Sequence, residues 1–144
     1  MGAWGARIFE SDSARDWAAD LCAVGGVAKA LRNLVGPDRH EIIRYEERGE
    51  EILIAAELLI AIRLGRPLPA FPPGLAALID EENQNDDLFD ETRDLLACCV
   101  TKLKQVCDQQ GGYAALWANK QGIVSPKWLA YVDELLRHLS PESQ

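Results

Sequence analysis

A single carboxylate interrupts the most apolar stretch of the chain. Glu57 lies within residues 52–62, where every other side chain is apolar. Burying an unpaired carboxylate is very costly, so this group must be protonated, ion-paired or hydrogen-bonded. We expect it to accept hydrogen bonds from backbone N–H groups of a loop, and the glycine-rich N-terminus is the natural donor. The functional alternative is a general base or metal ligand with a shifted pKa.

The first seventeen residues combine glycines with bulky aromatic side chains. Trp4 and Phe9 can each bury roughly 150–250 Å². The structural interpretation is a loop that fills a groove of the protein, with Asp12 capping the first helix. The functional interpretation places Trp4, Asp12, Asp16 and Glu57 around a ligand pocket. A hydrolase-like enzyme that uses Glu57 with Asp12 or Asp16 is the catalytic version of this second interpretation.

Acidic residues are concentrated in one segment, residues 80–94. Eight acids and one base there contribute −7 of the net charge of −8. Such a run is typical of a solvated helix start, or of a surface that docks a basic protein. A calcium loop is a poor fit, because Asn85 stands where the required glycine belongs. The eight acids of this acidic face are Asp80, Glu81, Glu82, Asp86, Asp87, Asp90, Glu91 and Asp94.

Searches for other catalytic or metal-binding patterns give nothing. His40-Glu41 lacks the second histidine of a zinc protease helix, and the four cysteines form no Cys-x-x-Cys pair. The sequence therefore predicts no metal, no cofactor and no catalytic residues. An acidic chain disfavours a nucleic-acid partner. The absence of a secretory signal or membrane-spanning run, together with cysteines that suit a reduced core, predicts a cytoplasmic protein with no membrane partner.

The elements that must position these residues are all helical. Helix 50–64 is hydrophobic all round, which is typical of a central core helix. Ser13 to Asp16 has the form of a capping box, with Asp12 as an alternative cap. No segment alternates as a strand would. We expect one domain over residues 1–144, with six or seven helices around residues 50–64. Helices are predicted over residues 13–24, 27–35, 50–64, 75–82, 86–109, 113–119 and 126–139, with a further turn or two within 40–48.

Helical spacing also predicts which side chains face the core. In the first helix the apolar edge is Trp17, Leu21 and Val24. In the segment 86–109, which we expect to be the longest helix, the inward positions are Phe89, Thr92, Leu96, Cys99, Leu103 and Val106. In the last helix they are Trp128, Leu129, Val132, Leu135, Leu136 and Leu139.

The two ends of the chain resemble an uncharacterised bacterial family, domain of unknown function 4259. The resemblance rests on Met1-Gly2-Ala3-Trp4-Gly5, Phe9, Asp12, Ala14 and Asp16-Trp17, and more weakly on Ala55-Ala56-Glu57, Leu116-Trp117 and the helix that begins Trp128-Leu129. Arg7 and Ile8 depart from the family pattern, where small residues are common. The resemblance implies a small helical bacterial cytoplasmic protein and supplies no activity to carry over.

Composition and motifs together favour a non-catalytic interaction module. Small size, acidity and the missing catalytic motifs suit an immunity-type or regulatory protein that binds a basic protein partner through the acidic face. The alternatives are a small-molecule-binding helical domain, with a pocket beneath the N-terminal loop, and the hydrolase-like enzyme.

Overall fold

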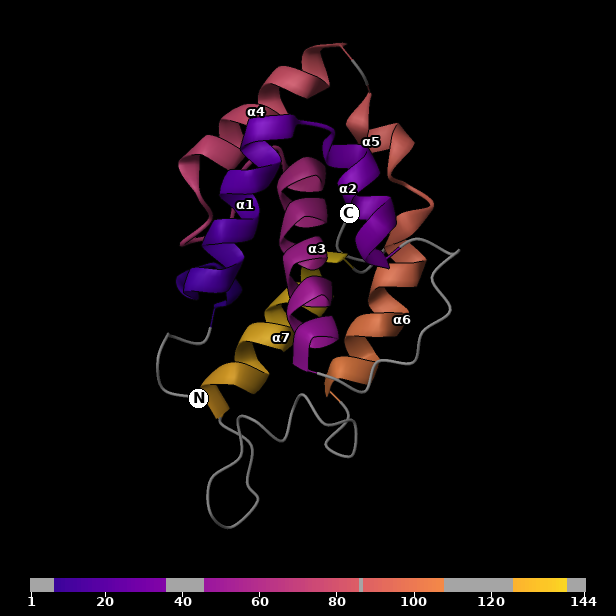
Figure 1. The fold of residues 1–144 in the computed structure, drawn as a ribbon. Coiled ribbons are helices and arrows are strands. Elements are labelled where there is room, and N and C mark those ends of the chain that lie inside the picture. Colours follow the sequence, from indigo (N-terminus) through magenta and orange to yellow (C-terminus); the bar gives the residue numbers. More distant parts are fainter. Residues whose placement is uncertain (1–6, 36–45, 86, 108–125, 140–144) are drawn as a thin grey trace.

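The computed structural model describes residues 7–35, 46–85, 87–107 and 126–139. Within these ranges the chain forms a short 3-10 turn and seven α-helices, with no strand (Figure 1). The predicted all-α fold is confirmed, whereas the predicted helix 113–119 lies outside the described residues. The elements are η1 (Ile8–Glu10), α1 (Asp12–Val24), α2 (Val27–Val35), α3 (Glu46–Leu64), α4 (Pro73–Asn85), α5 (Leu88–Glu91), α6 (Leu95–Cys107) and α7 (Pro126–Leu139).

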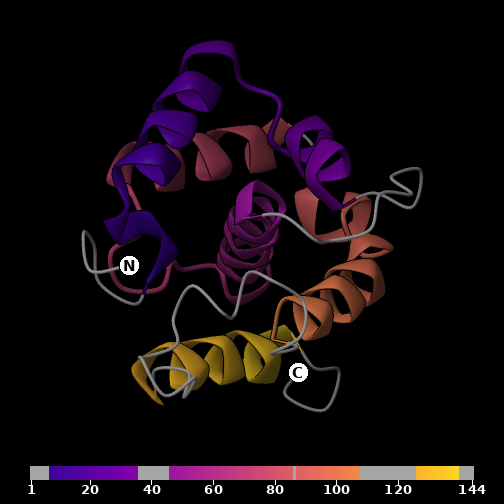
Figure 2. The same cartoon turned by 60° about the horizontal axis from the view of Figure 1, so that its bottom comes forward.

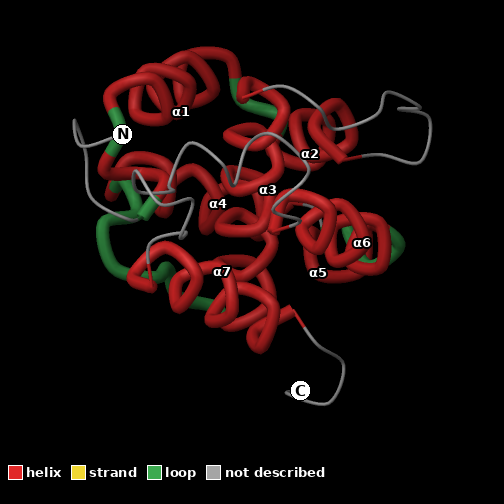
Figure 3. The backbone as a smooth tube through the Cα atoms, turned by 90° about the horizontal axis from the view of Figure 1, so that it is seen from below, coloured by secondary structure: helices red, strands yellow, loops and turns green. Residues whose placement is uncertain are grey.

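Helix α3 forms the centre of the molecule. The other elements surround it in the views of Figures 2 and 3, and it packs directly against η1, α2, α5, α6 and α7. Every residue from 52 to 62 is buried. A helix without a polar face is stable only where apolar neighbours cover all its sides, so the predicted central core helix is confirmed. It begins at Glu46, four residues earlier than predicted, and Gly49 therefore lies inside it.

One residue, Ser11, separates η1 from helix α1, and the N-cap of this helix differs from the prediction. The cap is Ser11, whose Oγ accepts from the Ala14 N–H at 3.2 Å, so neither the Ser13 capping box nor an Asp12 cap forms. Ser11 has extended backbone angles where η1 ends, which points its hydroxyl at the first free N–H groups of the helix. The predicted apolar edge is also partly wrong, because Val24 is 83% exposed.

A pair of glycines joins α1 to α2. Gly25 and Gly26 have φ values of +76° and +85°, a region that glycine adopts without strain. The carboxylate of Glu82, on α4, accepts from the Gly26 N–H at 2.7 Å and the Val27 N–H at 2.8 Å. These N–H groups lie at the start of α2 and have no partner within that helix. Helix α4 therefore caps α2 from outside.

The predicted long helix 86–109 is wrong, because two helices, α5 and α6, occupy this segment. Asp87 caps α5 by accepting from the Asp90 N–H at 3.2 Å. The Thr92 hydroxyl donates to the Leu88 carbonyl at 2.6 Å, and the Leu95 N–H donates to the Thr92 carbonyl at 3.0 Å. These local bonds replace the regular helical pattern at residues 92–94, so that α3 is the longest helix within the described residues.

The break at Thr92 also changes which side chains face inward. Leu88 is buried, whereas Phe89 is 39% exposed. The Arg63 guanidinium lies over the Phe89 ring, with its Cζ atom 3.6 Å from the ring centre. Beyond the break, the predicted inward positions Cys99 and Leu103 are buried, as is Thr92 itself. Helix α4 is longer than predicted, since residues 83–85, expected to be a link, are its last turn.

Helix α7 presents a wide apolar face to α3 and α6. Trp128, Val132, Leu135 and Leu139 are buried, as predicted. Leu129 is instead 37% exposed, and Tyr131 takes the expected inward place. Because Tyr131 carries a hydroxyl, this exchange brings a hydrogen-bonding group into the core.

Candidate functional site

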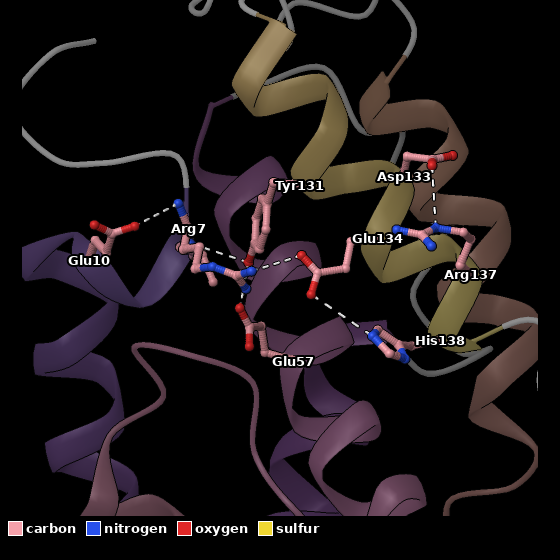
Figure 4. A network of polar contacts seen from close by, with 9 residues as sticks. Arg7, Glu10, Glu57, Tyr131, Asp133, Glu134, Arg137 and His138 are labelled. Carbon is pink, nitrogen blue, oxygen red and sulfur yellow. Dashed lines mark hydrogen bonds and ion pairs between the residues drawn. The ribbon is translucent and has the colours of Figure 1, made fainter.

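Glu57 lies in the middle of α3 and is fully buried. The Tyr131 hydroxyl, on α7, donates to Glu57 Oε2 at 2.7 Å. The Ile8 N–H, on η1, donates in turn to the Tyr131 hydroxyl at 3.2 Å. The three groups form a buried chain of hydrogen bonds from a backbone amide through a phenol to a carboxyl group (Figure 4). This chain connects the central helix to the N-terminal turn and the last helix.

The expectation that Glu57 is hydrogen-bonded is confirmed, and its donor among the described residues is the Tyr131 hydroxyl. The glycines of the N-terminus, from which we expected the donors, lie outside the described residues. The N-terminal segment does contribute a backbone N–H, yet it reaches Glu57 only through Tyr131. Sequence reasoning overlooked Tyr131. Its position was a usable signal, since it lies three residues after Trp128 and four before Leu135, on the buried face of α7. A phenol buried in this way requires a partner, and Glu57 is the buried carboxyl group that needs one.

Arg7 brings a positive charge next to this chain. Its Nη2 donates to Glu134 Oε1 at 2.8 Å, and its guanidinium carbon lies 5.4 Å from the centre of the Tyr131 ring. The other carboxylate oxygen of Glu134 lies 3.9 Å from His138 Nε2. Figure 4 shows Arg7, Glu134 and His138 in a row beside Glu57 and Tyr131. The N-terminal segment is therefore attached to α7 by an ion pair as well as a hydrogen bond.

Burial controls the electrostatics of the site. Burial raises the pKa of Glu57 to about 7, against the lowering effects of the Tyr131 hydrogen bond and the Arg7 charge. The negative charge of Glu134 raises it further. Burial also raises the pKa of Tyr131 well above its ordinary value, so the phenol keeps its proton and acts as donor. Glu57 is thus a carboxyl group whose protonation changes near neutral pH.

Two atoms of the site lack a partner among the described residues. They are Glu57 Oε1 and Arg7 Nη1, and both are buried. Buried polar atoms are nearly always hydrogen-bonded, so an unpaired oxygen on a buried carboxyl group is an energetic weakness of the folded state. The weakness is greatest when Glu57 is ionised, because the negative charge on the buried Oε1 then has no described hydrogen-bond donor.

The two aspartates of the predicted pocket do not join Glu57. Asp12 and Asp16 lie on α1 with exposed side chains, and that of Asp12 is 98% exposed beside Arg15. Trp4 lies outside the described residues. Within the ranges that the structure describes, no three His, Cys, Asp or Glu side chains gather closely enough to hold a metal ion. The described geometry therefore places neither aspartate beside Glu57, and the carboxylate that does act on it, that of Glu134, is paired with Arg7.

Several carboxylates of the acidic face serve the fold. Glu82 caps α2, and Asp87 caps α5. The Asp94 carboxylate accepts hydrogen bonds from Arg32 Nη1 at 3.0 Å and from Arg32 Nη2 at 3.2 Å, and this contact lowers the pKa of Asp94. Asp90 lies 3.3 Å from Arg93. These contacts lie on the surface, where each contributes modestly to stability.

Three other acids of the face have no such role in the described structure. The side chains of Asp80 and Glu81, on α4, and of Glu91, on α5, are exposed and make no ion pair or hydrogen bond with described residues. We call these three the free acids. Asp86, the remaining predicted member, lies outside the described residues. The acidic face thus separates into structural carboxylates and the free acids.

A shallow hollow adjoins one of the free acids. It lies between the end of α3 and helix α4, has a volume of about 40 Å³, and is lined by Ala61, Gly65, Arg66, Pro67, Ala76, Ile79 and Asp80. Small-molecule pockets are typically about 300–1,000 Å³, so this hollow fits at most a small side chain or a water molecule. Its lining does not include Glu57.

Comparison with known proteins identifies a family. A family model described as a domain of unknown function (DUF4259) matches residues 2–130, which confirms the resemblance seen in the sequence. No curated protein and no solved structure matches the chain. Across the described helices, none has both the length and the apolar character needed to cross a membrane.

Proposed function

Since the chain belongs to the DUF4259 family, whose description names no activity, we propose from the geometry that it is a non-catalytic interaction module. Its partner is a basic protein, bound through the free acids Asp80, Glu81 and Glu91. An immunity-type or regulatory role follows from this mode of binding, because an acidic surface can cover a cationic site on another protein.

The observation that carries the proposal is the placing of Asp80 and Glu81 on α4. This helix contains no Lys or Arg, and the positions three and four residues from either acid hold only Ala, Leu, Asn and Gln. Consecutive acids without cations repel one another, and they lie nearer the C-terminal end of the helix, where negative charge is unfavourable. The folded chain gains nothing from these carboxylates, so a role outside the fold accounts for them best.

The chemistry of such a surface defines the partner. Lys and Arg side chains neutralise exposed carboxylates, and a net charge of −8 steers a basic protein toward this one before contact. The small hollow beside Asp80 offers room for one small apolar side chain next to a cation of the partner. Binding of this kind weakens as salt screens the charges.

The alternatives lack a comparable observation. The hydrolase-like enzyme needs Asp12 or Asp16 next to Glu57, and both side chains are exposed on α1 while Glu57 is buried. The small-molecule site beneath the N-terminal loop depends on Trp4, which lies outside the described residues. It stays a prediction.

Charge reversal confined to the free acids tests the proposal. The variant Asp80→Lys/Glu81→Lys/Glu91→Lys leaves every structural carboxylate in place. Tagged wild-type and variant proteins are used to capture partners from cells that carry the gene, over a series of salt concentrations. We expect the wild type to retain a stoichiometric basic protein at low salt, and the variant to lose it.

A matched control separates a specific surface from general charge. Asp16→Lys/Asp20→Lys/Asp133→Lys reverses three exposed acids on α1 and α7, outside the acidic face, and so changes the net charge by the same amount. This control should keep the partner at low salt. The proposal is wrong if the control and the free-acid variant lose the partner equally, or if the free-acid variant binds as well as the wild type.

A further inference from the structure

The buried hydrogen-bond chain joins three parts of the fold through one ionisable group, a feature that does not depend on the proposed partner. Its central group, Glu57, is fully buried and keeps one oxygen, Oε1, without a partner among the described residues. The groups on either side of it come from different elements: Tyr131 from α7 and Ile8 from η1. A change of charge at Glu57 therefore acts on the contacts between three parts of the fold.

We propose that Glu57 is a proton-controlled latch, whose ionisation loosens the attachment of the N-terminal turn η1 to α3 and α7. In the closed state the Ile8 N–H, the Tyr131 hydroxyl and Glu57 Oε2 are linked as described above. Opening means that η1 moves away and water reaches the carboxyl group. Protonation of Glu57 favours the closed state, and ionisation favours the open one.

The direction follows from the partners of the two oxygens. When Glu57 is neutral, Oε2 still accepts from Tyr131, and the unpaired Oε1 carries no net charge. When Glu57 is ionised, Oε1 carries part of a full negative charge in the dry interior, where no described donor reaches it. Water supplies the missing donors once η1 opens, so the charged form gains more from opening than the neutral form does.

The turn η1 is the element that the latch releases, and it is the shortest of the described elements. It has three residues, and its polar links to α7 are the Ile8–Tyr131 hydrogen bond and the Arg7–Glu134 ion pair. Arg15, on α1, also donates to the Phe9 carbonyl at 3.0 Å and the Glu10 carbonyl at 3.1 Å, so η1 stays attached to α1 when it leaves α3 and α7. The apolar contacts are those of Ile8 and of Phe9, whose ring packs edge-on against Phe71 at 5.2 Å. Short peripheral elements open at lower free energy than core helices. Opening exposes these two apolar side chains.

The charges around Glu57 support the same direction. Burial is the largest influence and raises its pKa, whereas Tyr131 and Arg7 lower it and Glu134 raises it. Arg7 is already paired with Glu134. Among the described side chains, the other charged or titratable groups on the elements that contact α3 are Glu10 on η1, Lys29 and Arg32 on α2, Asp90 and Glu91 on α5, Cys98, Cys99, Lys102 and Lys104 on α6, and Lys127, Asp133, Arg137 and His138 on α7.

Hydrogen exchange at the Ile8 amide measures the latch directly, because this amide is released only when η1 opens. For a carboxyl group with a pKa of about 7 when closed and 4.5 when open, the opening equilibrium rises roughly tenfold between about pH 6 and pH 8. Protection factors, corrected for the pH dependence of chemical exchange, should fall by that factor. The amide of Leu59, within α3, serves as a reference for global unfolding.

Three outcomes decide the proposal. It is supported if Ile8 is less protected than Leu59, loses about tenfold protection as pH rises, and stops responding in Glu57→Gln. It is overturned if Ile8 and Leu59 share the same protection at every pH, since Ile8 then exchanges only through global unfolding. It is also overturned if protection of Ile8 stays constant between these pH values, or falls equally in Glu57→Gln.

A second measurement keeps the test independent of the variant. The side-chain carboxyl carbon of Glu57 in the wild-type protein reports its titration by NMR. Titration near neutral pH supports the latch even if Glu57→Gln fails to fold. Titration at the ordinary value of a glutamate overturns it, because ionisation would then be complete at pH 6.

Discussion

Replacing Glu57 by Gln should stabilise the protein at and above neutral pH. The amide keeps an oxygen that can accept from Tyr131, as Glu57 Oε2 does, and removes the buried charge. The folded-state pKa of Glu57 is raised, so the stability linked to its protonation is fully present below the unfolded value of 4.5 and is lost as pH rises through about 7. The glutamine variant does not undergo this loss.

The size of the effect follows from the two pKa values. Each factor of ten in proton affinity corresponds to about 1.4 kcal/mol, so the change from 4.5 to about 7 corresponds to about 3 kcal/mol of unfolding free energy. Glu57 is fully buried, and solvent screening therefore does not reduce this figure as it would at a surface. The gain of Glu57→Gln over the wild type should be small near pH 5 and approach about 3 kcal/mol near pH 8.

Urea denaturation at several pH values measures the gain. Tryptophan fluorescence is a suitable signal, because Trp128 is fully buried on α7, the helix that carries Tyr131. Other titrating groups are common to both proteins, so they cancel in the difference between variant and wild type. The informative quantity is how this difference changes between about pH 5 and pH 8.

A difference that stays constant over this range would refute the reasoning, since it would mean that Glu57 has the same pKa in the folded and unfolded states. Glu57→Ala supplies a contrast. It removes the acceptor of the Tyr131 hydroxyl and leaves a cavity in the core, so it should be destabilising by about 2–5 kcal/mol near pH 5. Because it also removes the titrating carboxyl group, its difference from the wild type should shift with pH as that of Glu57→Gln does, while it stays less stable than Glu57→Gln at every pH. Equal stability of the Ala and Gln variants would show that the hydrogen bond has no importance.

Two further predictions concern other parts of the fold. Glu82→Ala should lower the unfolding free energy measured by urea denaturation by about 1–3 kcal/mol, because it removes both oxygens that cap α2. The matched variant Glu81→Ala should change the unfolding free energy by less than about 0.5 kcal/mol, and similar losses in the two variants would contradict the capping role. Iodoacetamide should modify the exposed Cys22 in the native protein and spare Cys99, since burial raises the pKa of Cys99 to about 12. Mass spectrometry of the labelled protein measures the modification at each cysteine, and equal labelling of the two would contradict the prediction.

The central helix could be predicted from sequence because its signal is local. Residues 52–62 are apolar on every side, and a helix of that kind can only be buried. The same logic identified Glu57 as a carboxyl group in need of a partner. Its partner could not be predicted by the same means, because Tyr131 is 74 residues away and the pairing depends on how α7 crosses α3.

The division of residues 86–109 shows a different limit. Helical spacing continues across this segment, so periodicity favours one helix. The interruption depends on the Thr92 hydroxyl, which bonds to the Leu88 carbonyl. A threonine within a helix often makes such a bond without breaking it, so the residue type alone does not reveal the break. In the same way, Glu82 looked like one acid among eight, and only the position of α2 shows it to be a cap.

The capping of α2 by Glu82 constrains the order in which the chain folds. Helix α2 has nine residues, too few to be stable alone in water, and its cap comes from a residue 56 positions away from Gly26. Its first turn is therefore completed only after α4 has docked. Gly25 and Gly26 have no side chain that could cap that turn locally, so we expect α2 to form late in folding, as a consequence of tertiary assembly.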